Sequence, residues 1–445
     1  MHYAPHMSDT IFALSSGSPP AAIAVIRISG PDAGEALRTL TGTMPEARHA
    51  ALATLRAADG SGNVIVLDKA LVLWLPGPGT ATGEDMAELH CHGGRAVVSA
   101  VAAALAALSG LRSAEAGEFT RRAFANGRID LAEAEGLADL LSAETELQRQ
   151  SAMAMAGGAF SQQVAEWRDD LLAASAQLEA VLDFADEDDV ATLPADFALR
   201  LDRLQRSIGA WLKRPRSEML REGFRVVIAG PPNAGKSTLF NALVECEAAI
   251  ATPIPGTTRD VITRPVALEG VPMLFADTAG LHDASDDVVE AIGIERALEA
   301  LDRADLVLWL GPQGQGPAHA WPGQVWPGQV WEVQSQCDRK DAVAKRSPRH
   351  CVSALTGQGM DGLRHDLAET ARKAMPKPGD AALNARQHGL LSDANRAIDA
   401  ASAQNDMLLA AENLRLARLA FDTLIGRTTT EHMLDTLFGQ FCIGK

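Results

Sequence analysis

Cysteine is scarce in this chain and follows no pattern. Five cysteines are scattered through 445 residues without paired spacing. Such an arrangement indicates neither a disulfide framework nor a zinc site. The run His90-Cys91-His92 does not indicate a metal either, because side chains alternate along a strand and only the two histidines would share a face. We expect these three residues to be structural or to line a ligand pocket.

Long apolar runs are missing as well. No apolar segment reaches the length that spans a bilayer. The start of the chain, MHYAPHMSDTIFALSS, lacks the basic stretch, apolar core and small-residue cleavage site of a signal peptide. We therefore expect a cytoplasmic location and no membrane partner.

Positive charge is in deficit. Lys and Arg number 40 against 57 Asp and Glu, which gives a formal net charge of −17. Nucleic-acid phosphates repel such a protein at long range, so tight nonspecific binding to nucleic acid is not expected. An RNA substrate would need a local patch or a partner protein for docking.

The hydrophobic pattern divides the chain into four segments. Residues 1–126 mix short β-like runs with an Ala/Leu-rich helical stretch near 99–108, which predicts an α+β domain. Residues 222–375 alternate buried strands with helices, which is typical of a doubly wound parallel sheet. Residues 127–221 and 376–445 are helical. The predicted fold class is therefore multidomain α+β and α/β, with a helical domain interrupted by an inserted α/β domain.

Three local features are predicted within the helical segments. Helical periodicity runs through 131–182, where few glycines interrupt it apart from Gly157 and Gly158. A second helix is predicted over 201–220. The sequence TTTE at 428–431 is typical of a capping box that opens the last helix.

A glycine-rich motif stands at the start of the α/β segment. Residues 230–237, GPPNAGKS, match G-x-x-x-x-G-K-S, directly after an apolar strand at 224–229 and before a helical stretch. In this setting the backbone amides wrap the phosphates of a nucleotide at a helix N-terminus. Lys236 would reach the terminal phosphates, and Ser237 would bind Mg²⁺.

Three further segments, in the expected order, indicate GTP rather than ATP. Residues 256–260, GTTRD, supply Thr258 as a second Mg²⁺ ligand. Asp277 follows a predicted strand and would orient a metal-bound water, and the amide of Gly280 would sense the γ-phosphate. Residues 353–354 (SA) stand where GTPases place the loop that touches the guanine O6.

The predicted GTP contacts come from all of these segments. They are Asn233, Ala234, Gly235, Lys236, Ser237, Thr238, Thr252, Thr257, Thr258, Asp277, Thr278, Ala279, Gly280, Asp338, Ser353 and Ala354.

The sequence departs from common GTPases at two places. The base-reading motif Asn-Lys-x-Asp is replaced by Ser335-Gln336-Cys337-Asp338. Asp338 keeps the carboxylate that accepts from guanine N1 and N2, whereas Ser335 and Gln336 predict weaker binding. The residue after Gly280 is Leu281, whose apolar side chain cannot orient the attacking water, so another polar residue is required.

The motifs resemble those of the MnmE (TrmE) family of GTPases, which modify carbon 5 of uridine in tRNA, over nearly the whole chain. Beside the GTPase core, the resemblance is carried by residues 9–11 (DTI), 24–30 (AVIRISG), 82–89 (TGEDMAEL), 92–94 (HGG), 117–120 (GEFT), 126–135 (NGRIDLAEAE), 292–296 (IGIER) and 441–445 (FCIGK).

The resemblance implies a partner, substrates and cofactors. The family forms homodimers through its N-terminal domains and acts with the FAD protein MnmG, in a heterotetramer or larger complex, on the wobble uridine of certain tRNAs. The product carries a carboxymethylaminomethyl or aminomethyl group. A 5-formyl- or methylene-tetrahydrofolate supplies the one-carbon unit, with Arg27, Glu88, Arg128 and Lys445 as its contacts.

The resemblance also implies how GTP is hydrolysed. Family members use K⁺ beside the phosphates, for which the ligands here would be Asn233, Thr252, Ile254 and Thr257. Glu290 stands where the family has a catalytic glutamate that orients water. Cys442 is a candidate nucleophile toward uridine carbon 6, and packing in an apolar tail is the alternative for this residue.

Two other functions are consistent with the same GTPase core. A ribosome-assembly GTPase would carry basic RNA-binding flanks, whereas the flanks here are acidic. The second alternative is a GTPase scaffold that has lost activity, which the departures at Ser335 and Gln336 would favour.

Overall fold

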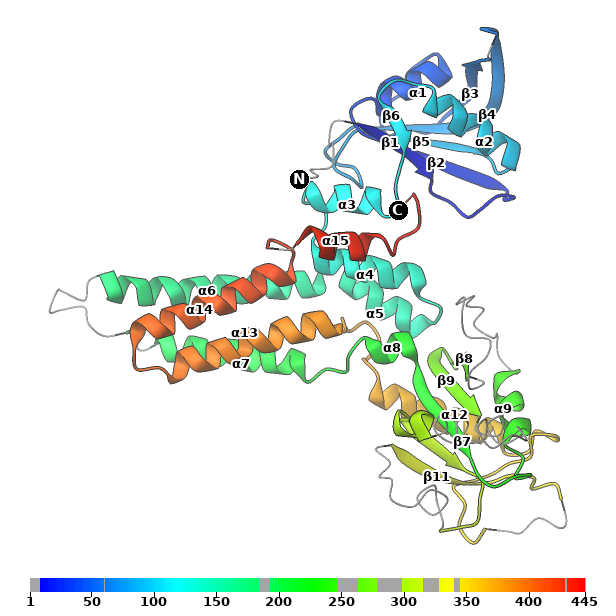
Figure 1. Cartoon of the computed structure of the whole chain (residues 1–445), viewed down its shortest axis with the longest axis vertical. Coiled ribbons are helices and arrows are strands. Elements are labelled where there is room, and N and C mark those ends of the chain that lie inside the picture. The colour runs from blue at the N-terminus through cyan, green and yellow to red at the C-terminus, as the bar shows by residue number, and fades with distance from the viewer. Residues whose placement is uncertain are drawn as a thin grey trace, which may run out of the picture. The chain divides into compact units, whose positions relative to one another are not determined.

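The computed structural model describes residues 9–59, 61–183, 193–194, 196–245, 263–277, 298–314, 328–339, 345–428 and 430–444. The chain separates into two compact units, residues 1–138 with 422–445 and residues 139–421. Each unit contains one six-stranded sheet, and the helices are distributed between them (Figure 1). The predicted boundaries at 126, 221 and 375 stay predictions.

The first unit is an α+β domain. Its sheet has the order β3-β4-β5-β2-β1-β6, and only the β1–β6 pair is parallel. The strands are β1 (Thr10–Leu14), β2 (Ile23–Ser29), β3 (Ala51–Ala58), β4 (Val64–Leu75), β5 (Met86–His92) and β6 (Leu111–Ser113). The helices are α1 (Ala33–Thr41), α2 (Arg95–Ala106), α3 (Glu118–Ala125), α4 (Leu131–Ser142, ending in the second unit) and α15 (Glu431–Phe438).

Successive side chains of β1 point to opposite faces of this sheet and contribute to a core on each face. Phe12 joins the larger core, to which α1 and α2 contribute. Ile11 and Ala13 point the other way and pack with Phe119 of α3. Because neighbouring side chains in a strand face opposite sides, one short strand holds both layers.

A buried ion network also holds α3 against β1. Arg122 is 6% exposed, and its guanidinium donates to the carboxylates of Asp9, Glu84 and Glu118. The three carboxylates compensate the charge of the buried guanidinium. We therefore expect the segments that carry Asp9, Glu84 and Glu118 to move as one body with Arg122.

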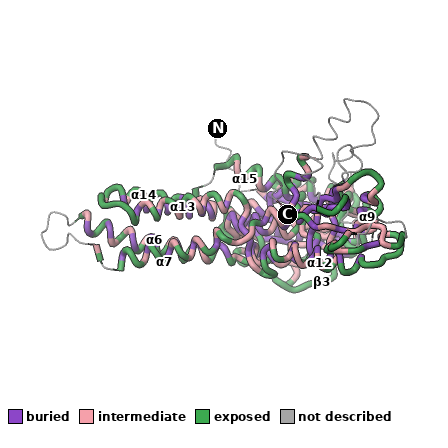
Figure 2. Tube along the Cα trace, turned by 90° about the horizontal axis from the view of Figure 1, so that it is seen from below, coloured by how far each residue is buried: buried purple, intermediate pink, exposed green. Residues whose placement is uncertain are grey.

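The second unit has helices outside the segment 224–374, which contains its sheet. They are α5 (Glu146–Ala156), α6 (Ala159–Asp183), α7 (Asp196–Leu212), α8 (Glu218–Glu222), α13 (Ala385–Ala403) and α14 (Met407–Leu424). Helices α6, α7, α13 and α14 lie side by side, and buried and exposed residues alternate along each of them (Figure 2). Trp167 of α6 stacks on Phe421 of α14 at 6.0 Å between ring centroids.

The other part of the second unit is a mixed sheet. Its order is β12-β11-β10-β7-β9-β8, and only β8 is antiparallel to its neighbour. Its elements are β7 (Phe224–Ala229), α9 (Lys236–Val244), β8 (Thr263–Leu268), β9 (Val271–Asp277), β10 (Leu306–Trp309), β11 (Gln329–Gln334), β12 (His350–Cys351) and α12 (Met360–Ala374). In open parallel sheets ligands bind at the carboxyl ends of the strands, so the carboxyl ends of β7, β9 and β11 locate the site.

The predicted fold class is confirmed, helices occupy most of the stretch 131–182 as predicted, and two other local predictions are wrong. The helical stretch over 131–182 has a break at 143–145, where Thr145 caps α5. The helix predicted over 201–220 ends at Leu212, because Pro215 removes a donor and cannot continue it. The last helix does begin at Glu431, but its N-cap is Thr430, whose side chain makes no capping bond, so the predicted box is absent.

No helix within the described ranges has the length and apolar character required to cross a membrane.

The capping box at Thr145 gives a stability prediction. The Thr145 hydroxyl accepts from the backbone N–H of Gln148, whose side chain also donates to the carbonyl of Leu220 at 2.7 Å. Thr145→Ala should lower the free energy of unfolding of this unit by about 1 kcal/mol, because a helix donor loses its acceptor. Chemical denaturation followed by circular dichroism measures the change.

Thr430→Ala is the matched control. Thr430 occupies the same helix position but makes no side-chain cap, so its removal should cost much less. Equal destabilisation by the two substitutions would contradict the capping argument.

Candidate functional site

The phosphate loop connects β7 to α9. Backbone turns place Asn233 at φ +63° and Gly235 at φ +87°, and α9 begins at Lys236. Lys236 is 5% exposed, and its Nζ donates to the carbonyl of Pro231 at 2.9 Å. The ammonium is thus folded back over its own loop, where an incoming phosphate would meet it together with the first amides of α9.

Asp277 lies at the next strand end. It is the last residue of β9, 3% exposed, and pairs in register with Ile228 of β7. Ser237, in the first turn of α9, is exposed. A carboxylate and a hydroxyl on adjacent elements are hard oxygen donors, which is the ligand type that Mg²⁺ prefers.

A pocket of about 350 Å³ lies beside the phosphate loop. The predicted residues that line it are Gly235, Thr238, Asp338, Ser353 and Ala354. The structure thus brings residues at the start of α9 together with the loops after β11 and β12, which lie 100 or more positions later in the chain.

Two side chains of the altered base-reading motif bind the phosphate loop. The Ser335 hydroxyl donates to the carbonyl of Ala234 at 2.6 Å, and the Gln336 side-chain amide donates to the carbonyl of Asn233 at 3.2 Å. Gln336 has φ +54°, and a Cβ on Gly235 would lie 3.0 Å from its Nε2. The two loops are therefore in close contact without the usual Asn-Lys pair.

The carboxylate of Asp338 is held in its charged form. A hydrogen bond from the Ser353 side chain, followed by a backbone N–H, keeps the pKa of Asp338 below its ordinary value. An ionised acceptor strengthens hydrogen bonds from the N–H groups of a base.

Four residues that line the pocket were not predicted from the sequence, and one of them, Val352, directly precedes Ser353. Arg339 follows the base-reading carboxylate, Leu239 follows Thr238, and Leu355 follows Ser353-Ala354. Leu355 is 81% exposed, which is unusual for a leucine beside a pocket and suits a lid over a flat base. Its position directly after the Ser-Ala pair was the only available signal.

Nine predicted residues lie outside the described part of the chain. They are Thr252, Ile254, Thr257, Thr258, Thr278, Ala279, Gly280, Glu290 and Lys445.

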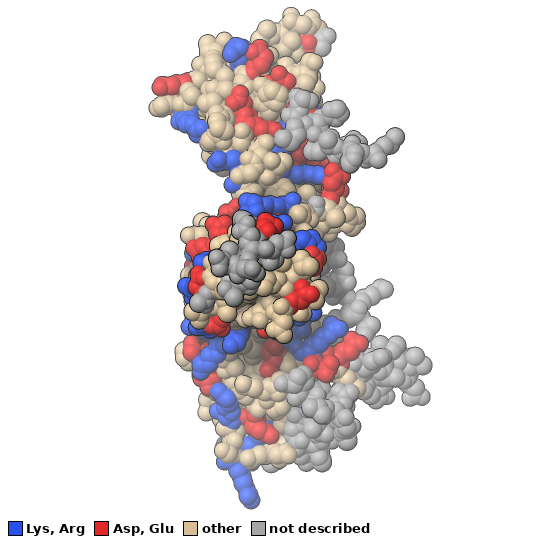
Figure 3. Space-filling view, turned by 90° about the vertical axis from the view of Figure 1, so that its left-hand side faces the viewer, with Lys and Arg blue, Asp and Glu red and all other residues tan. Residues whose placement is uncertain are grey.

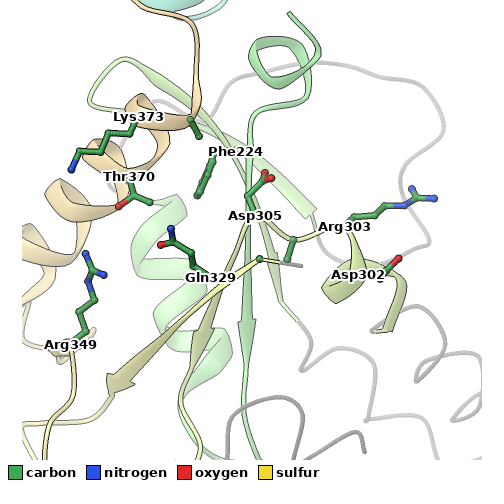
Figure 4. A pocket seen from close by; sticks show the side chains of 11 residues that line it. Phe224, Asp302, Arg303, Asp305, Gln329, Arg349, Thr370 and Lys373 are labelled. Atoms are coloured by element: carbon green, nitrogen blue, oxygen red, sulfur yellow. The ribbon is translucent and has the colours of Figure 1, made fainter. Parts of the chain in front are cut away.

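A second, larger pocket of about 710 Å³ lies at the opposite edge of the same sheet. Figure 4 shows Lys373 and Thr370 of α12 on one side of it and Asp302 and Arg303 on the other. It opens where β7, β10 and β11 begin, whereas the phosphate loop follows the end of β7. Its size does not make it the nucleotide site, because it lacks the phosphate loop and the base-reading carboxylate.

In the first unit, Arg27 and Glu88 form a pair across β2 and β5. The guanidinium donates to Glu88 Oε1 at 3.0 and 3.1 Å, and the His90 ring lies 3.1 Å from Oε2. Burial acts to raise the pKa of Glu88, but His90 and Arg27 outweigh it, and the pKa is lowered. His92 contacts Asp68 rather than Glu88. Cys91, which stands between the two histidines in the sequence, is buried.

Arg128 lies beside the turn that follows β4. It is exposed, and a Cβ on Gly83 would lie 3.2 Å from its side chain. Within the described ranges no contact joins Arg128 to Arg27 or Glu88, so their common site stays a prediction.

The C-terminal tail docks on the first unit. Phe441 is 5% exposed and packs with Phe438, and Ile443 forms a β-bridge with Ala116. The carbonyl of Gly444 accepts from the Ser15 hydroxyl at 2.8 Å. Gly444 has φ +95°, and a Cβ there would lie 2.2 Å from the carbonyl oxygen of Leu14, so only glycine fits. Cys442, between these anchors, is exposed.

Comparisons with known proteins identify the family. The family model described as the MnmE helical domain matches residues 131–442, and the one described as the GTP-binding protein TrmE N-terminus matches residues 10–128. A tRNA modification GTPase MnmE from Novosphingobium aromaticivorans is 60% identical over 99% of this chain and 100% of its own length. Its counterpart from Erythrobacter litoralis is 59% identical over 98% and 100%. The chain belongs to the MnmE family.

Membership in the MnmE family makes this chain a GTPase, with GTP as its substrate. Among solved structures, the G domain of the T. maritima FeoB iron transporter is 22% identical and covers 33% of this chain and 97% of its own, with a TM-score of 0.24. A likeness of that size carries no argument about function.

The base pocket gives a specificity prediction. A carboxylate at position 338 would accept from guanine N1–H and N2–H, whereas an amide would present an N–H that suits the 2-carbonyl of xanthine. Asp338→Asn should therefore weaken GTP binding about 10- to 100-fold, the worth of a charged hydrogen-bonded contact, and strengthen xanthosine triphosphate binding. Calorimetric titration with both nucleotides measures the change.

Asp302→Asn is the control for this test. Asp302 lines the second pocket, so its substitution should leave the preference for GTP unchanged. Loss of GTP binding by Asp338→Asn without any gain for the xanthine nucleotide would argue against direct base reading.

Proposed function

We propose that this chain is a K⁺-dependent GTP hydrolase. Together with the FAD protein MnmG, it would add a carboxymethylaminomethyl or aminomethyl group to carbon 5 of the wobble uridine of certain tRNAs. A tetrahydrofolate derivative would supply the one-carbon unit, and the cytoplasm is the proposed location. Family membership over the whole chain length carries the proposal.

The nucleotide site supports the GTPase part. Lys236 would meet the terminal phosphates, and Ser237 would ligate Mg²⁺, with Asp277 holding a metal-bound water. Asp338 would accept from the guanine edge. Ser335 and Gln336 contact the phosphate loop and would keep the base pocket aligned with the phosphates.

K⁺ would supply positive charge beside the β- and γ-phosphates, in the place of an arginine finger. Of its proposed ligands, Asn233 is exposed on the phosphate loop and offers a side-chain oxygen, which suits a large monovalent cation. We propose Thr252, Ile254 and Thr257 as its other ligands and Glu290 as the residue that orients the attacking water.

The first unit offers charges that suit a folate. Carboxylates such as Glu88 accept from pterin N–H groups, and Arg27, Arg128 and Lys445 would bind carboxylates of the glutamate tail. The docked C-terminal tail would bring Cys442 to the same unit, where its exposed thiol is a candidate nucleophile toward uridine carbon 6.

The surface charge supports a need for a partner in tRNA binding. On the face shown in Figure 3, Lys and Arg side chains are interspersed with Asp and Glu side chains. The described residues of that face form no continuous basic area, which a protein binding RNA through phosphates alone would need. A second protein or a dimer would supply the remaining contacts.

The hydrolysis proposal is tested by exchanging cations. At equal ionic strength, GTP turnover should be much faster in KCl than in NaCl, because no arginine finger is evident in the sequence. Lys236→Ala should lower turnover about 100-fold or more in either salt. Equal rates in both salts would remove the K⁺ proposal while leaving the GTPase assignment intact.

The modification proposal is tested at Gly444. Gly444→Ala should displace the tail, because the new Cβ would lie 2.2 Å from the Leu14 carbonyl oxygen. Tetrahydrofolate binding and wobble-uridine modification should then fall sharply, while GTP turnover persists. Titration with the folate and mass spectrometry of tRNA from a complemented deletion strain measure the two effects.

Ile443→Ala serves as the control and Cys442→Ser separates docking from chemistry. Ile443 is 63% exposed and bridges through its backbone, so its truncation should have little effect. Cys442→Ser should abolish modification but keep folate binding if the thiol is the nucleophile. Full modification by the Gly444→Ala protein would overturn the role of the tail.

A further inference from the structure

Two cysteines meet between the loops that line the base pocket. Cys337 directly precedes Asp338 in the loop after β11, and Cys351 is the last residue of β12. Their Sγ atoms lie 2.7 Å apart, although both are free thiols. The backbone N–H of Cys337 also donates to the carbonyl of Val352 at 3.2 Å, so the two segments are already aligned.

The separation of the two sulfurs distinguishes a redox pair from a metal site. A disulfide joins its sulfurs at about 2.05 Å, which needs a small approach from the present distance. Two thiolates on one tetrahedral zinc ion would stand about 3.7 Å apart, given zinc–sulfur bonds of about 2.3 Å. Within the described ranges no group of three or more His, Cys, Asp or Glu side chains could hold a metal.

We infer that Cys337 and Cys351 form a redox modification site, at which a peroxide converts the two thiols into a disulfide that locks the guanine-binding loops. The disulfide itself depends only on the two thiols. Its effect on nucleotide binding rests on the guanine site proposed above.

The chemistry balances with one peroxide per disulfide. Exposed Cys351 loses its proton, its thiolate attacks one peroxide oxygen and the O–O bond breaks, which leaves a sulfenic acid and a hydroxide that takes up that proton to form water. The Cys337 sulfur then attacks the Cys351 sulfur, the S–O bond breaks, and a second water leaves with the Cys337 proton. Two thiols lose two electrons in total, which the peroxide gains.

The surroundings of the two thiols support this order of events. Burial, and then the neighbouring Cys351 and Asp338, raise the pKa of Cys337 to about 12. A thiol that stays protonated reacts slowly with an oxidant, so Cys337 is suited to the second step. Cys351 is exposed and is the sulfur that a dissolved oxidant reaches first.

The disulfide would hold the base-reading groups in place. Asp338 follows Cys337, Ser353 lies two residues after Cys351, and the Ser353 side chain hydrogen bonds to the Asp338 carboxylate. A covalent bond across residues 337–351 therefore restrains both partners of this contact. Release of the base requires these loops to separate, so the oxidised protein should release guanine nucleotides more slowly.

The other cysteines are poor competitors for the same partner. Cys91 is 1% exposed, and burial raises its pKa to about 12. Cys442 is exposed but belongs to the first unit. Cys246 lies outside the described residues, so the test must identify the linked positions directly.

The experiment uses the full-length protein, reduced with a dithiol and then treated with hydrogen peroxide. Remaining thiols are blocked, and tryptic peptides are mapped by mass spectrometry, which separates the two cysteines because Arg339 and Arg349 lie between them. We expect a Cys337–Cys351 linkage that a dithiol reverses. Dissociation of a fluorescent GDP should slow about tenfold on oxidation, roughly half of what a 15-residue disulfide loop contributes in free energy. Cys351→Ser and Cys337→Ser proteins should show no such slowing.

Each outcome bears on one part of the inference. Linkage of Cys442 or intermolecular disulfides in place of the 337–351 linkage would overturn the modification site. The correct linkage with an unchanged dissociation rate would overturn its effect on the nucleotide. Failure of the reduced protein to bind GDP would instead contradict the proposed guanine site, and the peptide map would still decide whether the disulfide forms.

Discussion

The nucleotide site depends on the contact between the phosphate loop and the loop that follows β11. Strand β10 separates β7 from β11 in the sheet, so no backbone ladder joins these two loops. The hydroxyl of Ser335 bonds the carbonyl of Ala234, and Gln336 reaches Asn233. These bonds set the distance between the groups proposed to bind phosphate and the groups proposed to read the base. The position of Asp338, three residues after Ser335, depends on that alignment and on the hydrogen bond from the Ser353 side chain.

A second close approach organises the other unit. Gly444 lies against the end of β1, where a side chain would collide with the backbone of Leu14. Chain ends fray unless they are tied down, and here a β-bridge, a hydroxyl and the buried ring of Phe441 hold the tail. The last residues thus belong to the first unit although most of the preceding helices belong to the second.

Much of this could be predicted from the sequence because the signals are local. The phosphate loop needs glycines next to a strand, and the structure has them there, at the end of β7. The helix break before Thr145 had its own signal, a threonine three residues before Gln148. The capping box predicted at Thr428 is absent, because the sequence pattern does not determine which of the three threonines becomes the N-cap.

The contact of Ser335 with the phosphate loop could not be predicted from local sequence. It depends on how closely the Ala234 carbonyl approaches across the sheet, and the weaker GTP binding predicted for Ser335 and Gln336 stays a prediction. The same applies to the Cys337–Cys351 contact, since one residue lies in the loop after β11 and the other ends β12, and no spacing rule supplies the register of these two segments. Contacts between loops on separate strands are set by tertiary packing, and sequence periodicity does not encode them.

The carboxylates of Asp338 and Glu88 keep their charge near neutral pH. The pKa values of Asp338 and Glu88 are lowered, so each carboxylate stays ionised until the pH falls through its lowered value. For Glu88, the stabilisation gained by pairing is present above the pKa of the unfolded chain and is lost only in acid. A change of one pH unit around neutrality therefore alters neither the guanine acceptor nor the Arg27 pair. Oxidation of the two thiols acts at neutral pH, and it acts directly beside the residue that reads the base.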